Sequence, residues 1–175
     1  LGSSPQTWHV FEGLGSNAMK TLHEKALELG VKVMTETPGK ELIMDGDRIA
    51  GIIAEKKDGT KIKINANAVI LATGGFADNK EMINMYTPHN YDNIEAIGSP
   101  QRTGDGIRMG MEVGADVVGM SAIMMCGGVL KGLGVNSELS VAAGRSPFLW
   151  VNEHGKRFAD ESIVFNFSFS GNAMS

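Results

Sequence analysis

The sequence predicts a mixed α/β (α+β) domain, and three features indicate this class. Residues 67–76 contain consecutive Val, Ile and Leu without alternation and end near Gly74-Gly75, a pattern typical of a strand buried on both faces. Upstream, apolar residues recur at helical spacing over residues 19–29. Between these segments, two Asp-Gly turns separate short apolar runs in residues 42–64, and in the last of them Ile62 and Ile64 alternate with lysines, which predicts a β-meander.

The predicted elements of this first part follow in the order helix, strand, meander, buried strand. Ser16 is a good N-cap for the helix, and Gly30 ends it. A short strand is expected at residues 31–35. The meander strands are expected at residues 42–44, 49–54 and 60–64.

The end of the predicted buried strand is the first candidate for a ligand site. Gly74 and Gly75 carry no Cβ atom, so another backbone or a ligand can approach them closely. In open α/β sheets, ligands bind at the carboxyl ends of the strands. We therefore expect a ligand beside residues 72–75.

A second group of elements follows Phe76. A helix is predicted over residues 78–86, with Asp78 as its N-cap, and Thr87-Pro88 ends it. Another helix is predicted over residues 103–114. Its inward face is expected to contain Ile107, Met111 and Val113. A strand at residues 148–152 is expected to lead into a tight turn at residues 152–155.

Composition excludes several classes of function. The 175 residues carry a formal net charge of −4 and no basic stripe, which argues against a nucleic-acid partner. No apolar run is long enough to span a membrane, and no signal peptide is visible, although in an internal piece the second absence says nothing about the location of the longer protein. A cytoplasmic location and a small-molecule partner are expected. A single cysteine, Cys126, leaves cysteine-based metal motifs without ligands, and no metal site is expected.

Three motifs, in order along the chain, resemble the flavoprotein subunit family of fumarate reductases and succinate dehydrogenases. They are ATGGF at residues 72–76, TGDG at residues 103–106, and VNEHGKRFADE at residues 151–161. The resemblance implies a partial FAD-binding, Rossmann-like domain with a β-meander over residues 1–76. It implies a capping domain, which covers the substrate, over residues 77–175.

The resemblance also implies which residues would contact FAD. They are the small and polar residues of the first two motifs and one glycine before the meander: Gly39, Ala72, Thr73, Gly74, Gly75, Thr103, Gly104 and Asp105.

The family begins with a strand, a GxGxxG turn and a helix that hold the FAD pyrophosphate, and this fingerprint is missing. The nearest approach is Gly13-Leu14-Gly15, with Ala18 where the third glycine belongs. Because the chain also begins at Leu1, we expect an internal piece of a longer flavoprotein, which alone binds FAD poorly and is inactive. The alternatives are a complete small domain of unknown role, or a non-catalytic ligand-binding or scaffold domain derived from a flavoprotein.

The residues of the family's chemistry are replaced here. The proton-donating arginine, four residues beyond the glutamate of the third motif, corresponds to Phe165, and a phenyl ring cannot donate a proton. The capping-domain histidine falls near Cys126. Arg145 is the candidate substrate contact, and Arg157 is expected to pair with Glu161.

These departures favour a substrate other than fumarate. Arg145, Pro147 and the spacing of residues 151–158 resemble the 3-ketosteroid dehydrogenase branch of the family. The resemblance therefore implies an FAD-dependent reductase or dehydrogenase that acts on an activated C=C or CH–CH bond of a bulky or apolar substrate. An electron-donor protein or domain is an expected partner.

Overall fold

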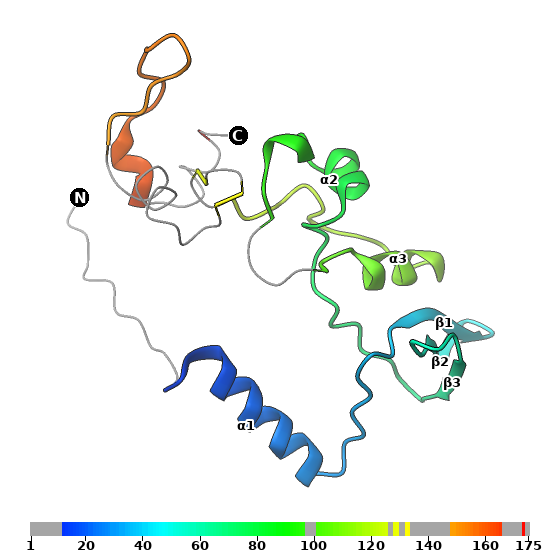
Figure 1. Cartoon of the computed structure of the whole chain (residues 1–175). Helices are drawn as coiled ribbons and strands as arrows, with labels where there is room; N and C mark the ends of the chain where they lie inside the picture. Colours follow the sequence, from blue (N-terminus) through cyan, green and yellow to red (C-terminus); the bar gives the residue numbers. More distant parts are fainter. Residues whose placement is uncertain are drawn as a thin grey trace. The chain divides into compact units, whose positions relative to one another are not determined.

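The computed structural model describes residues 12–96, 101–125, 128–129, 132–133, 148–165 and 173. The described residues divide into two compact units, one lying within residues 1–38 and 55–61 and the other within residues 39–54 and 62–175. Figure 1 shows the helices and strands. They are α1 (Leu14–Glu28), β1 (Gly39–Asp45), β2 (Arg48–Glu55), β3 (Lys61–Asn65), α2 (Lys80–Tyr86) and α3 (Asp105–Glu112), with 3-10 turns at Tyr91–Asn93 and Glu161–Phe165.

Helix α1 begins earlier than the sequence predicts, and Ser16 lies inside it, so the predicted N-cap is wrong. Gly13 is the N-cap, with a left-handed φ of 75°, and the Asn17 side chain donates to the Glu12 carbonyl across this start (2.9 Å). The predicted end is confirmed, because Gly30 follows the helix with a φ of 82°. No residue of α1 is buried.

The strand predicted at residues 31–35 is absent. These residues form no strand, and Val31 and Val33 are 53% and 45% exposed. A strand needs a neighbour for its backbone hydrogen bonds, and none of the described strands pairs with this segment.

The predicted β-meander is confirmed. β1, β2 and β3 form one sheet in that order, and β1 pairs with β2 in antiparallel register, with Asp45 opposite Arg48 at the turn. In β3 the isoleucines are half-buried and the lysines are exposed. The alternation therefore gives one wet face, as the pattern indicates.

Residues 67–76 are not a buried strand, and this prediction is wrong. They lie outside any strand, Ile70 is 89% exposed, and only Phe76 is buried. A central strand needs a hydrogen-bonded neighbour on each side, and the described sheet ends at β3. The apolar run is thus present without the neighbouring hydrogen-bonded strands that a buried central strand requires.

The core of the second unit lies around Phe76, Met82 and Ile83. Partly buried residues pack around these three: Tyr86, Tyr91, Ile94, Ile107, Met120 and Ile123. Helix α2 contributes two of the core residues. Its N-cap is Asn79, whose side-chain oxygen accepts from the Met82 amide (3.0 Å), so the assignment of this role to Asp78 is wrong by one residue.

Helix α3 packs against β1 (Figure 1). Gly106, Met109 and Gly110 are its buried residues, whereas Met111 is 38% exposed, so the predicted inward face is wrong at that position. The helix ends at Glu112, two residues before the expected end. None of the helices in the described ranges has the length and apolar character needed to cross a membrane.

Gly51→Ala is expected to destabilise the meander. A Cβ atom at Gly51, where φ is +156°, would lie 2.1 Å from the Ile64 carbonyl oxygen of the neighbouring strand. We expect the free energy of unfolding to fall by about 1–3 kcal/mol in urea titrations followed by circular dichroism. Lys63→Ala, on the exposed face, is the control and should change it by less than about 0.5 kcal/mol. Equal effects of the two substitutions would contradict this packing.

Candidate functional site

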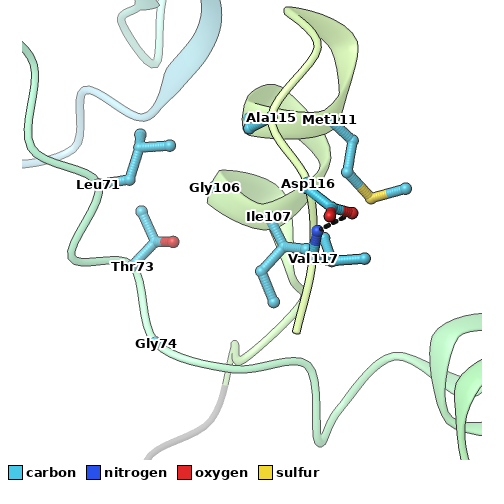
Figure 2. A pocket seen from close by; sticks show the side chains of 10 residues that line it. Leu71, Thr73, Gly74, Gly106, Ile107, Met111, Ala115, Asp116 and Val117 are labelled. Carbon is cyan, nitrogen blue, oxygen red and sulfur yellow. Dashed lines mark hydrogen bonds between the residues drawn. The ribbon is translucent and has the colours of Figure 1, made fainter. Parts of the chain in front are cut away.

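Two of the three motifs meet in one pocket. Figure 2 shows Leu71 and Thr73 pointing from the segment of residues 71–74 toward α3, with Gly106 facing Thr73. The pocket has a volume of about 260 Å³. It is lined by Leu71, Thr73, Gly74, Gly106, Ile107, Gly110, Met111, Ala115, Asp116 and Val117.

Close approach of α3 to residues 71–74 depends on Gly106. A Cβ atom there would lie 2.1 Å from Thr73 Oγ1, a distance that no side chain tolerates. At Gly110, one turn later, a Cβ would make ordinary contacts of 3.7 Å with Leu71 and Ala115. The second glycine of TGDG therefore sets the distance between the two motifs.

The first glycine of TGDG, Gly104, is required by the backbone conformation and by contact with the core. Gly104 precedes α3 with a left-handed φ of 77°, and a Cβ atom would lie 2.4 Å from Met82 Sδ and 3.0 Å from Phe76 Cβ. Gly104 thus turns the chain into the helix while touching the core. Next to it, the Asp105 carboxylate accepts from the Arg108 guanidinium (2.9 Å), and hydrogen bonds from Arg108 and Thr103 lower the pKa of Asp105.

The other predicted cofactor residues have different surroundings. Gly39 begins β1, where a Cβ would lie 2.6 Å from Ile52 Cδ1 and 3.8 Å from Met109 Cε, so packing already explains this glycine. Gly74 and Gly75 have no neighbouring atom within 4 Å of an ideal Cβ. Ala72 is exposed. Open space therefore lies beside the glycine pair, as an approaching ligand requires.

The lining of the pocket indicates which part of a ligand it suits. It offers the Thr73 hydroxyl and the Asp116 carboxylate, and the latter accepts from the Val117 amide (2.8 Å; dashed line in Figure 2). No lysine or arginine is among the lining residues. A diphosphate needs cations or several N–H donors, and this lining supplies no cationic side chain for one.

The third motif forms a tight turn closed by one β-bridge between Val151 and Arg157. The Asn152 amide donates to the Lys156 carbonyl (2.9 Å), and Gly155 has a left-handed φ of 70°. The predicted turn is confirmed, whereas the predicted strand at residues 148–152 reduces to this single bridge.

Glu161 anchors this turn. Its carboxylate, in a residue only 4% exposed, accepts from the Arg157 guanidinium and from the Trp150 amide (2.9 Å), which confirms the predicted Arg157–Glu161 pair. Bonding to Arg157, first of all, lowers the pKa of Glu161 to about 2. Within the described residues, the indole N–H of Trp150 is buried without a hydrogen-bond partner.

The structure does not bring the predicted substrate residues together. Arg145 and Cys126 lie outside the described residues, and Phe165 ends the 3-10 turn Glu161–Phe165. Sequence reasoning also missed Arg102, whose backbone and side chain bond to Asp78. An Asp–Arg pair 24 residues apart leaves no local signal in the sequence.

The family model described as "FAD binding domain" matches residues 3–172. The vinyl phenol reductase of Lactiplantibacillus plantarum is 36% identical over 183 residues, which cover 99% of this chain and 37% of that enzyme. The NADH:acrylate oxidoreductase of Vibrio harveyi is 34% identical over 84% of this chain and 15% of its own length. The chain thus spans little more than a third, or less, of the relatives it matches.

A solved structure of an oxidoreductase is also similar to most of this chain and is matched over less than a third of its own length. The 3-ketosteroid-Δ4-(5α)-dehydrogenase of Rhodococcus jostii RHA1, in complex with 4-androstene-3,17-dione, is similar to this chain with a TM-score of 0.61 and 29% identity. The match covers 89% of this chain and 29% of the dehydrogenase.

Gly106→Ala and Gly110→Ala form a matched pair of variants on one helix. Alanine is the better helix former by about 1 kcal/mol, so Gly110→Ala should raise the unfolding free energy by up to that amount. Gly106→Ala should instead lower it by about 1–3 kcal/mol, because the new methyl collides with Thr73. Urea unfolding would measure both, and a stabilising Gly106→Ala would contradict the observed approach of α3.

Low pH should destabilise the turn at residues 151–157, which the Glu161 carboxylate holds through Arg157 and Trp150. A carboxylate with a lowered pKa contributes stability that is complete above its ordinary pKa of 4.5 and is lost as the pH falls toward 2. Trp150 fluorescence, measured in a Trp8→Phe background, should therefore change between these pH values. Glu161→Gln should show the altered signal already at pH 7, and an unchanged acid transition in this variant would contradict the assignment.

Proposed function

The chain belongs to the FAD binding domain family, and we propose that it forms part of an oxidoreductase that transfers a hydride between FAD and an activated C=C or CH–CH bond. In this proposal residues 1–76 contribute to the FAD-binding domain and residues 77–175 to a capping domain over the substrate. An electron-donor protein or domain supplies or removes the electrons.

The observation that carries the proposal is the meeting of ATGGF and TGDG at one pocket. Space beside the glycine pair admits a ligand, and the Thr73 hydroxyl and the Asp116 carboxylate offer partners for neutral hydrogen-bonding groups. The residues that would hold FAD are Gly39, Ala72, Thr73, Gly74, Gly75, Thr103, Gly104 and Asp105. FAD supplies the redox chemistry when it is bound, and these residues would bind and orient it.

The pocket fits only part of the cofactor. Its lining has no cation, so the ring or the hydroxyl-bearing chain of FAD suits it better than the diphosphate. In this proposal, the residues that neutralise the diphosphate lie outside this pocket. We accordingly expect weak FAD binding by these 175 residues alone.

Features of the sequence and of the relatives favour a mainly apolar substrate. Phe165 stands where the family's acid is expected, so a dicarboxylate would lose its proton donor. The Lactiplantibacillus relative is named for a vinyl phenol, and the Rhodococcus structure holds a steroid dione. Arg145 is the proposed contact to the polar end of the substrate.

The absorbance spectrum of the protein purified from its complete reading frame tests the cofactor. Flavin bands near the usual visible wavelengths are expected there and should be much weaker in the 175-residue chain, because the diphosphate partners are missing. A colourless protein that takes up no added FAD would overturn the proposal.

Turnover with a panel of alkenes tests the substrate. With reduced viologen as donor, a vinyl phenol or a cyclic enone should be reduced at least about tenfold faster than fumarate, a difference of about 1.4 kcal/mol in the barrier. Acrylate is the small carboxylate control. Turnover of fumarate or acrylate alone would contradict an apolar substrate while leaving the flavin assignment intact.

A further inference from the structure

Asp78 and Arg102 join the two chain segments that carry the ATGGF and TGDG motifs. The Asp78 amide donates to the Arg102 carbonyl (3.0 Å), and the Arg102 amide donates to the Asp78 carboxylate (2.8 Å). The Arg102 Nε–H donates to the same carboxylate oxygen (3.3 Å). We name this set of three bonds the Asp78–Arg102 latch.

The latch is partly withdrawn from water. The side chains of Arg102 and Asp78 are 30% and 24% exposed, whereas the other ion pairs of the second unit are mostly more than half exposed. Burial reduces screening by solvent and salt, so this pair is worth more than a surface ion pair. Two of its bonds also involve backbone atoms, which fixes the main chain and not only the side chains.

Asn79 extends the latch to the TGDG motif. Its side-chain nitrogen donates to the Thr103 carbonyl (2.8 Å), while its side-chain oxygen caps α2. Gly104 follows and touches Met82 and Phe76. The backbone of residues 102–104 is thus held at three successive positions by residues 76–82.

The backbone next to the latch is strained. Gln101 has a φ of +73°, in the left-handed region that residues other than glycine rarely adopt. Such a conformation persists only where surrounding contacts impose it, and it is frequent at ligand sites. The three bonds of Arg102 fix the chain immediately after this residue.

We propose that Asp78 and Arg102 are positioning residues that hold Thr103–Gly106, at the start of α3, beside Phe76 and Thr73 and so preorganise the FAD site before the cofactor binds. Neither residue lines the pocket, and they act through the backbone of the two motifs. The inference rests on the proposed function, since it concerns FAD at this site. Preorganisation raises affinity because the cofactor need not order the segment when it binds.

The test uses the protein from the complete reading frame, stripped of FAD and titrated with it while the quenching of flavin fluorescence is followed. Asp78→Asn should weaken FAD binding about tenfold, as expected for the loss of a charged hydrogen-bond partner. Asp92→Asn breaks the exposed pair with Lys80 and should weaken binding less than about twofold.

Arg102 provides a second pair of variants. Both Arg102→Lys and Arg102→Met keep the two bonds of the residue-102 backbone, but only lysine keeps a positive charge for the Asp78 carboxylate. FAD affinity should therefore remain within about threefold of the wild type in Arg102→Lys and fall about tenfold in Arg102→Met. Hydrogen exchange of the Thr103–Asp105 amides, measured without FAD, should accelerate in Asp78→Asn and Arg102→Met only. A merely stabilising pair would instead change exchange throughout the unit.

The outcomes separate the two proposals. A wild-type protein that binds no FAD overturns the proposed function and this inference together. A wild-type protein that binds FAD, with Asp78→Asn and Arg102→Met binding equally tightly, overturns the positioning role alone. Faster exchange confined to residues 103–105, with weaker FAD binding, supports the positioning role.

Discussion

The bonding between Asp78 and Arg102 is the constraint on which the rest of the site depends. It ties together two segments that no strand connects, and the core residues Phe76 and Met82 lie directly beside the joined backbone. Gln101, the residue just before this bonding, has a left-handed φ of 73°. The pocket is therefore a property of long-range pairing more than of either motif.

Glycines then set how closely the paired segments approach. Gly104 and Gly106 are required for steric reasons at two different neighbours, the core and Thr73. Gly74 and Gly75, by contrast, have empty space where a Cβ would stand. Small residues therefore serve internal packing at Gly104 and Gly106, and they leave open space at Gly74 and Gly75. Only the second pair of glycines supports the prediction of a bound ligand.

Local chemistry allowed most of the described elements to be predicted. Asp-Gly turns and alternation identified the meander, because hairpin pairing is local. The prediction of a buried strand at residues 67–76 was wrong, because burial of a strand depends on neighbouring strands that its own residues do not specify. The caps at Gly13 and Asn79 differ from the predicted ones by a few residues, and Asp78 looked like a cap because its partner is remote in sequence.

Helix α1 has a consequence of its own. It has fifteen residues, none of them buried, with Met19 and Leu22 each 65% exposed on one face. A helix of this length is marginal in water without tertiary contacts, so the cost of opening it is close to zero. Its amide protons should therefore exchange nearly as fast as those of a free peptide. Protection of these amides would report directly that some surface had covered the apolar face.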